Sequence, residues 1–302
     1  MSKIVFWSPF HGQGQTSNLH IISLIACLIF NKKTLMMHTH FTMNNFEGPL
    51  IGKCMERLST DDNSIFQDIG IDAAVMYSRM NQLVGDTLES CCITFPNTNL
   101  LLLPGTEIKN REIFERDISS TVCRMIKHSE NCVDIIAIDT NSGNDSLSIK
   151  LISSADVIVV NLTQRRYVLK RLFMEYGDIM SNKNVFFLFG KYDKNSAYNI
   201  QNCRRKYRKF IRKENSGVIP YCTKFMDAQN ECNIIGMVSK GIHNKDIEIS
   251  KFTNPVIKLF NLRQNAAGET DEFFNQAYNS TRKIINMLNI TEEKFQKESS
   301  GA

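Results

Sequence analysis

The sequence has little proline, little glycine and little net charge, which are the features that distinguish disordered and collagen-like chains. Proline and glycine are scarce, at 6 and 15 of 302 residues, and the formal net charge is only +5. With 42% apolar residues, this composition excludes a disordered chain, which needs low hydrophobicity and high net charge, and also a collagen-like or low-complexity chain. The length suits one large α/β domain or two small ones.

Long hydrophobic runs are also absent. The longest apolar stretch, residues 21–30, is interrupted by Ser23 and is much shorter than the roughly 20 residues that a bilayer-spanning helix needs. The apolar segment at residues 4–7 is too short for the core of a signal peptide. We therefore expect a cytoplasmic protein without a transmembrane segment.

Paired cysteines are missing as well. The nine cysteines are scattered, no C-x-x-C occurs, and the only adjacent pair is Cys91 and Cys92. Zinc sites need ligands paired at short spacing, and disulfide frameworks belong to small secreted domains. We expect neither, and we interpret most of the cysteines as small buried hydrophobic residues.

Short apolar runs alternate with amphipathic stretches of helical length along most of the chain. Runs typical of strands covered on both faces occupy residues 4–7, 34–38, 99–103, 133–139, 156–161 and 184–189. Helical spacing occupies residues 17–30, 111–128, 166–180 and 198–213. This alternation predicts an α/β fold, a doubly wound and mostly parallel sheet flanked by helices.

The sequence contains no linker rich in proline, serine or glycine that would divide it. We therefore predict a single domain over residues 1–290, with a helical insertion at 41–95 and a flexible polar tail at 291–302. Residues 271–290 have the spacing of a further amphipathic helix. Its few cations favour packing onto the sheet over binding to a membrane surface.

The most informative stretch follows the first predicted strand and opens the first predicted helix. It reads Ser8-Pro-Phe-His-Gly-Gln-Gly-Gln-Thr-Ser17, at the position where a phosphate-binding loop belongs in such a fold. Gly12 and Gly14 would let the backbone approach an anion, and the helix N-terminus supplies unpaired N–H groups. On local sequence alone, a glycine-containing turn capped by Thr16 or Ser17 is an equally good interpretation.

A second polar turn follows the run at residues 133–139. Asp139 ends this run, and Thr140 to Gly143 follow it. An acidic residue at the carboxyl end of a strand beside the first strand is well placed to reach Mg²⁺ indirectly. Thr16 stands where the hydroxyl of a phosphate-binding loop would hold the same ion.

Together these segments resemble the ParA/MinD family of deviant P-loop ATPases, which implies a P-loop NTPase-like fold. The matching residues are Gly12-x-Gly14-x-Thr16, Asp134 to Gly143, Ala155 to Val160, Phe187 to Asp193, Val218 to Pro220 and Ala228. Within the family, the degenerate loop is most similar to that of the atypical TadZ-like members, which accompany pilus or secretion machinery. Residues 70–72 and 103–106 are similar to those members too.

The resemblance also implies a cofactor and a set of partners. The cofactor would be ATP or ADP with Mg²⁺, held by Gly12, Gln13, Gly14, Gln15, Thr16 and Ser17, with Thr16 and, indirectly, Asp139 at the metal. Family members dimerise face to face over the nucleotide, so a homodimer is implied. The resemblance also implies protein partners in a membrane-associated or secretion machine. It implies a peripheral position at the membrane or cell pole.

The sequence departs from the family at its cationic and water-positioning residues. The family loop reads K-G-G-x-G-K-[ST], but here Phe10 stands for the signature lysine and Gln15 for the P-loop lysine. The second strand usually ends D-x-D, but here it ends His38-Thr-His40. Losing the P-loop lysine removes a charge-assisted hydrogen bond of about 1.5–3 kcal/mol, so we expect nucleotide binding weakened about ten- to a hundredfold.

Hydrolysis should suffer more than binding, because phosphoryl transfer is catalysed mainly by positioning and charge stabilisation. The sequence therefore predicts a spatial organiser or assembly factor with weak or absent ATP hydrolysis. The alternative is an active ATPase in which His40 or His11 replaces the missing groups. His38 and His40 would face one side of a strand, but two histidines without a third ligand are a weak metal signal.

Residues 204–213 carry most of the positive charge. Their seven basic residues are Arg204, Arg205, Lys206, Arg208, Lys209, Arg212 and Lys213. This density indicates an anionic partner, either nonspecific DNA, as in a partitioning protein, or an acidic lipid or protein surface. A solvated helix face packed by Tyr207, Phe210 and Ile211 is an equally good interpretation.

Overall fold

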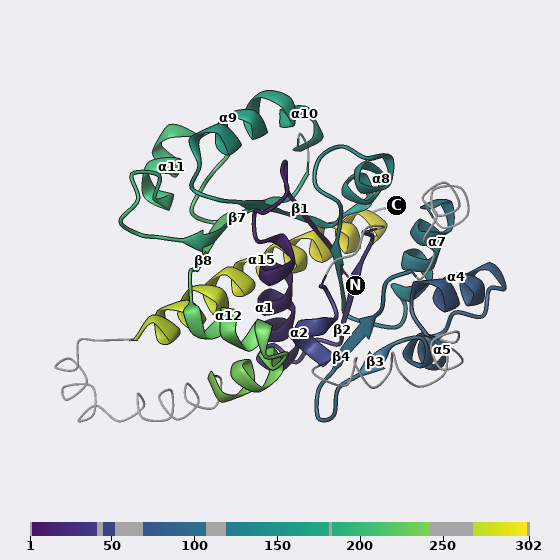
Figure 1. Cartoon of the computed structure of the whole chain (residues 1–302). Helices are drawn as coiled ribbons and strands as arrows, with labels where there is room; N and C mark the ends of the chain where they lie inside the picture. The colour runs from purple at the N-terminus through teal and green to yellow at the C-terminus, as the bar shows by residue number, and fades with distance from the viewer. Residues whose placement is uncertain are drawn as a thin grey trace.

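Strands from the whole length of the chain form one central sheet (Figure 1). The computed structural model describes residues 2–40, 45–51, 69–106, 119–180, 183–241 and 268–300. Within these residues the strands are β1 (Ser2–Trp7), β2 (Thr34–His38), β3 (Ile93–Thr94), β4 (Leu100–Leu103), β5 (Ile135–Asp139), β6 (Val157–Leu162), β7 (Val185–Tyr192) and β8 (Ser216–Pro220).

The order of the described strands is β3-β4-β2-β5-β1-β6-β7-β8. Every neighbouring pair is parallel except β3 and β4. The chain winds outward from β1 in both directions, as a doubly wound sheet does. The predicted α/β fold with a mostly parallel sheet is therefore confirmed, and all six predicted strands are present.

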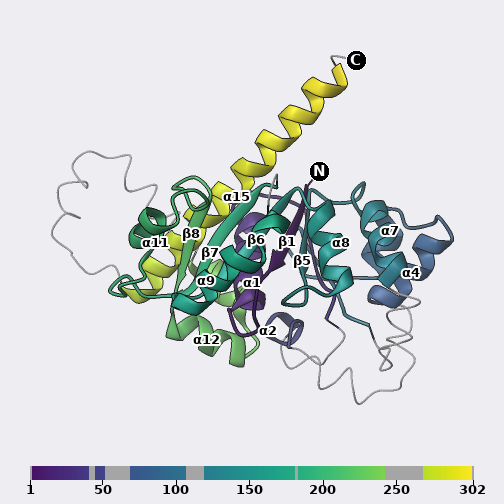
Figure 2. The ribbon, with the colours of Figure 1, turned by 90° about the horizontal axis from the view of Figure 1, so that it is seen from above.

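Helices cover both faces of the sheet (Figure 2). They are α1 (Gln15–Leu28), α2 (Gly48–Ile51), α4 (Ile71–Arg79), α5 (Gly85–Ser90), α7 (Ser119–Ser129), α8 (Ser146–Ser154), α9 (Arg166–Glu175), α10 (Gly177–Met180), α11 (Ile200–Lys206), α12 (Thr223–Asn230) and α15 (Glu269–Ser300).

The alternation of side chains along β1 explains why two apolar cores form. Val5 and Trp7 enter the core beneath α4, α5, α7, α8 and α9, whereas Ile4 and Phe6 enter the core beneath α1, α12 and α15. Successive strand residues point to opposite faces, so a strand that is apolar throughout must be covered on both. Each such buried side chain contributes about 1.5–3 kcal/mol to stability.

Two of the predicted helices are shorter than their sequence spacing suggests. The helix predicted over 198–213 covers only Ile200–Lys206, because Tyr207 leaves helical geometry at φ −112° and ψ 37°. Tyr207 and Phe210 instead stack on Phe173 of α9, each with a ring separation of 4.7 Å. The helix predicted over 166–180 is divided at Tyr176, whose ring packs on Trp7.

The outcome of the domain predictions differs from segment to segment. Residues 41–44 and 52–68 of the predicted insertion lie outside the described residues. Its described part holds α2, α4 and α5 and also the short strand β3. Helix α15 packs on α1 and β8, as predicted, and Figure 2 shows its C-terminal end extending beyond the sheet. It continues to Ser300, past the predicted helix end at residue 290.

The described part of the chain bears on two predictions, those for membrane-spanning helices and for disulfides. None of the described helices is both long and apolar enough to cross a membrane. The eight cysteines that the structure describes are free thiols, and five of them are buried. Burial raises the pKa of four of the buried thiols, Cys27, Cys92, Cys203 and Cys222, and that of Cys203 reaches about 11. These thiols therefore behave as small apolar side chains.

His20 on α1 makes stability depend on pH. It is fully buried, with its ring 5.2 Å from that of Phe46. Burial lowers the pKa of His20 from 6.5 to about 4, although the Asp139 and Glu47 carboxylates oppose the shift. The unfolded chain binds a proton on His20 below pH 6.5, but the folded chain does so only near pH 4, so stability falls as the pH drops through this window.

We expect a loss of about 3 kcal/mol from His20 between pH 6.5 and pH 4. Urea unfolding of the wild type and of His20→Leu at several pH values measures this loss. The variant should lose less stability than the wild type as the pH falls. Equal losses in the two proteins would mean that His20 binds its proton as readily in the folded chain as in the unfolded chain.

Candidate phosphate-binding site

The carboxyl ends of β1, β2 and β5 meet at one point of the sheet. In the register of these parallel strands, Phe6 and His38 both lie opposite Asp139. The turn after β5 is tied to the end of β1, because Trp7 Nε1 donates to Gly143 O at 2.6 Å. Ligands bind at such a point in open α/β sheets, where the chain winds outward in two directions.

The loop from Ser8 to Gly14 leaves β1 here and enters α1. Gly12 and Gly14 have φ values of 77° and 76°, a region that glycine adopts without strain. A Cβ at Gly12 would meet no heavy atom within 4 Å, so the space beside the loop is open. The N–H groups of the first turn of α1 lack intrahelical acceptors, and this turn has no acidic residue. An anion fits this position.

Gln15 occupies the place of the P-loop lysine, and its side chain is turned into the protein. Its Nε2 donates to Asp139 Oδ1 and Thr140 O, each at 2.6 Å, and to Phe6 O at 3.0 Å. Its Oε1 accepts a hydrogen bond from Ser8 Oγ at 2.7 Å. Three acceptors therefore surround an amide nitrogen that carries two hydrogens.

Asp139 joins the loop to the end of β2. It is fully buried, and its Oδ2 accepts from Thr16 Oγ1 at 2.6 Å and lies 3.3 Å from His40 Nε2. Burial alone would raise the pKa of Asp139, but hydrogen bonding to His40, the charge of His40, and the bonds from Thr16 and Gln15 hold it below its ordinary value. Asp139 is therefore an ionised carboxylate.

His40 shows the opposite shift for the same reason. Burial alone would lower the pKa of His40, but the hydrogen bond and charge of Asp139 raise it above its ordinary value. Its Nδ1 lies 2.9 Å from Asn141 Oδ1. His40 is thus held as the charge partner of Asp139.

Thr16 and Asp139 fit a magnesium ion. Mg²⁺ prefers oxygen ligands and is usually held through a few of them together with water and phosphate oxygens. Thr16 Oγ1 and Asp139 Oδ2 are two such oxygens, and they lie 2.6 Å apart. Thr16 would bind the ion, and Asp139 would orient it indirectly; the ion would neutralise phosphate charge.

The two histidines at and just after the end of β2 lie beside different carboxylates. His38 and His40 have ring centroids 5.7 Å apart, but His38 Nε2 lies 3.0 Å from Glu47 Oε1, so each ring faces a separate carboxylate. In the part of the chain that the structure describes, no three His, Cys, Asp or Glu residues are grouped to hold a metal.

Two other loop residues have clear positions. Phe10, in place of the signature lysine, packs on α9, with its ring centroid 5.5 Å from that of Tyr167 and 4.6 Å from the Arg171 guanidinium. His11 is exposed, and its backbone oxygen accepts from Gln13 Nε2 at 3.2 Å. The sequence alternative in which His11 replaces one of the missing groups of an active ATPase stays a prediction.

Sequence reasoning missed the polar contacts that fix the loop to β6. Gln13 Oε1 accepts from the N–H and the hydroxyl of Thr163, at 3.1 and 2.7 Å. Asn18 donates to Asn161 Oδ1 at 2.9 Å. The available signal was Asn161 itself, a buried polar residue at the carboxyl end of an apolar strand.

The basic segment divides into two environments. Arg204 is partly buried and donates to Ser216 Oγ at 2.9 Å. The other six predicted residues, Arg205, Lys206, Arg208, Lys209, Arg212 and Lys213, are exposed. The segment lies on α11 and the turns after it, away from the loop that follows β1 (Figure 1).

The sequence matches no family model and no curated protein, whereas its fold matches solved structures. A ParA family ATPase from Chlorobium tepidum TLS matches with a TM-score of 0.64 and 12% identity, over 90% of this chain and 96% of that one. A plasmid partition protein from Borrelia burgdorferi B31, bound to AMPPNP, matches with a TM-score of 0.61 and 13% identity, over 94% and 98%. The septum site-determining protein MinD from Pyrococcus horikoshii OT3, complexed with Mg-ADP, matches with a TM-score of 0.61 and 13% identity, over 95% and 98%.

The sheet order and the glycine loop after β1 define a P-loop NTPase fold. More closely, the chain has the fold of the ParA and MinD ATPases. The resemblance seen in the sequence is thereby confirmed at the level of the fold.

Proposed function

We propose that this chain is a ParA/MinD-type nucleotide-binding protein with a degenerate site, acting as a spatial organiser or assembly factor. The observation that carries the proposal is the inward position of Gln15, which replaces the P-loop lysine and binds Asp139. ATP or ADP with Mg²⁺ would be held on Gly12, Gln13, Gly14, Gln15, Thr16 and Ser17. Backbone N–H groups would contribute most of the contacts to phosphate.

Weak or absent hydrolysis follows from the state of His40. A group that activates the attacking water must accept or orient its proton. His40 stands where the family has a carboxylate, but Asp139 raises its pKa and favours the protonated ring. A protonated imidazole has no acceptor nitrogen. Both ring nitrogens of His40 also face other side chains, Asp139 and Asn141. We therefore do not expect His40 to take over the role of the family's water-positioning carboxylate.

The proposal extends to assembly and partners. By its resemblance to the TadZ-like members, the chain would form a homodimer and serve a membrane-associated or secretion machine, at the membrane or cell pole. Since Phe10 is packed on Tyr167 and Arg171 of its own chain, no lysine reaches across from this position. Dimerisation would then be independent of nucleotide.

Phosphate release from ATP, measured with malachite green, tests the hydrolysis part of the proposal. We expect rates at background level with and without Mg²⁺, and no difference between the wild type, Asp139→Ala and Thr16→Val. Turnover typical of P-loop ATPases that disappears in Asp139→Ala would overturn the proposal in favour of an active ATPase with substituted residues.

A second candidate function is nonspecific DNA binding, and the six exposed cations of residues 205–213 favour it. Phosphate contacts by exposed lysine and arginine give affinity that falls steeply with salt, because counterions are released. In gel shifts across a salt series, Arg205→Glu, Lys206→Glu and Arg208→Glu together should abolish any shift. Lys150→Glu, an exposed cation on α8, is the control. An unchanged shift in the triple variant, or none at low salt, would exclude this function.

A further inference from the structure

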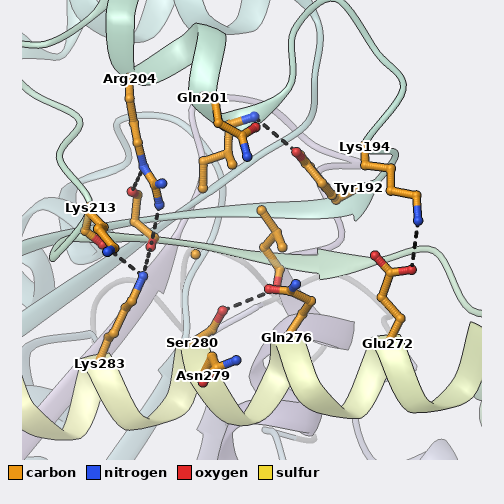
Figure 3. A pocket seen from close by; sticks show the side chains of 14 residues that line it. Tyr192, Lys194, Gln201, Arg204, Lys213, Glu272, Gln276, Asn279, Ser280 and Lys283 are labelled. Carbon is orange, nitrogen blue, oxygen red and sulfur yellow. Dashed lines mark hydrogen bonds and ion pairs between the residues drawn. The ribbon is translucent and has the colours of Figure 1, made fainter. Parts of the chain in front are cut away.

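A pocket of about 400 Å³ lies along the outer edge of β8, between α11 and α15 (Figure 3). Three of its lining cations come from separate parts of the chain: Arg204 from α11, Lys213 from the turn before β8, and Lys283 from α15. Figure 3 shows Arg204 and Lys283 approaching the same point of β8 from opposite sides. The fold, and not the sequence run alone, therefore concentrates positive charge here.

The edge strand turns backbone donors toward this pocket. Asn215 O accepts from Phe187 N at 2.9 Å, and the backbone of a parallel strand alternates in direction. Ser216 and Val218 consequently point their N–H and C=O groups away from β7. Among the hydrogen bonds of the described residues, none uses the N–H of Ser216 or Val218.

The outward carbonyl groups of β8, in contrast, have donors. Ser216 O accepts from Lys283 Nζ at 2.8 Å and from Arg204 Nη2 at 3.4 Å. Val218 O accepts from Ser280 Oγ at 3.2 Å. With these acceptors occupied and Ser216 and Val218 themselves buried, the groups at this edge that can meet an anion are the side-chain cations.

The positive charge of the pocket exceeds the negative charge of its one lining carboxylate, Glu272. Lys194 is paired with Glu272 at 3.3 Å, but no described carboxylate lies within ion-pair distance of Arg204, Lys213 or Lys283. Burial lowers the pKa of Arg204 and of Lys283, and the charge of Arg204 lowers that of Lys283 further; Glu214 opposes both shifts. An anion bound between Arg204 and Lys283 would stabilise the charged forms of both side chains, because opposite charge favours ionisation.

We propose that this pocket binds a small phosphorylated molecule, whose phosphate is held by Arg204 and Lys283. The guanidinium fork suits phosphate oxygens, and Lys213 adds charge at the more exposed side. The volume matches small-molecule sites, and the amides of Gln201, Gln276 and Asn279 are among the other groups that line the pocket. The site is separate from the loop after β1 and does not depend on nucleotide binding there.

Calorimetric titration with pyrophosphate at constant ionic strength tests this site. Lys283→Gln should weaken binding about ten- to a hundredfold, because it removes a charge-assisted contact. Lys213→Ala should weaken it about threefold, since an exposed charge contributes less. Arg208→Ala, an exposed cation of the same segment that does not line the pocket, should leave binding unchanged.

Thermal unfolding of each variant separates a loss of pyrophosphate binding from a loss of stability. Lys283 also binds carbonyl groups of Lys213 and Ser216, so its loss can lower stability, whereas Lys213 is exposed and its truncation should not. Unchanged pyrophosphate binding in both pocket variants would overturn the proposal, as would equal weakening in Arg208→Ala. Binding that is unchanged by Gln15→Ala, but lost with the pocket variants, would separate this site from the loop.

Discussion

Replacing Gln15 with lysine should tighten the binding of Mg-ATP about ten- to a hundredfold, the free-energy equivalent of one charge-assisted hydrogen bond to phosphate. An ammonium group at position 15 would find three hydrogen-bond acceptors, because Phe6 O, Asp139 Oδ1 and Thr140 O lie within 3.0 Å of Gln15 Nε2. An ammonium group has three hydrogens for these acceptors, and it can turn to phosphate when the ligand enters. Titration calorimetry measures the change.

The control for this substitution is Gln13→Lys. Gln13 lies in the same loop, but its Oε1 accepts from Thr163 of the turn after β6, so a lysine there loses this contact. Gln13→Lys should not tighten binding. If Gln15→Lys leaves the affinity for Mg-ATP unchanged while the protein stays folded, the loop does not hold phosphate in the family's manner.

Replacing Asp139 with alanine should have the largest effect on stability. The carboxylate is fully buried and meets His40, Gln15 and Thr16. Removing one partner of a buried charge pair leaves the other charge uncompensated, at a cost of about 3–5 kcal/mol. Urea unfolding at pH 6.5 should show this loss as a lower midpoint with an unchanged slope.

A control substitution and a double-mutant cycle show whether the loss of stability comes from the charge pair of Asp139 and His40. Asp227→Ala removes an exposed carboxylate on α12 and should change the free energy of unfolding by no more than about 0.5 kcal/mol. In a double-mutant cycle, Asp139→Ala and His40→Ala should be strongly non-additive, because the second change removes the uncompensated charge. Additive effects, or a loss below about 1 kcal/mol for Asp139→Ala, would mean that Asp139 does not hold these elements together.

The sequence predicts for a simple physical reason that the residues of the candidate site lie close together. Carboxyl ends of parallel strands meet at one edge of a sheet, so two polar turns after buried strands had to lie close together. The contact between Thr16 and Asp139 follows from this rule. The inward direction of Gln15 does not, because it depends on acceptors that β1 and β5 supply only once they are paired.

The elements that the sequence did not predict depend on tertiary contacts. Ser216-Gly-Val-Ile-Pro220 contains residues that are rare in strands, and β8 forms because β7 pairs with it and α15 covers it. The pocket beside it needs Lys283, which α15 brings to Ser216. Lys283 is distant in sequence from Arg204 and Lys213, and no local pattern relates them. The basic segment alone therefore did not predict that Lys283 adds to the positive charge at this edge of the sheet.

The most direct test of the central claim is a titration of Mg-ADP into the wild-type chain. The account predicts saturable binding to one site per chain that weakens when EDTA removes Mg²⁺, because backbone N–H groups, Thr16 and Asp139 remain to hold phosphate and ion. Absence of any saturable heat from a chain shown to be folded by circular dichroism would contradict it.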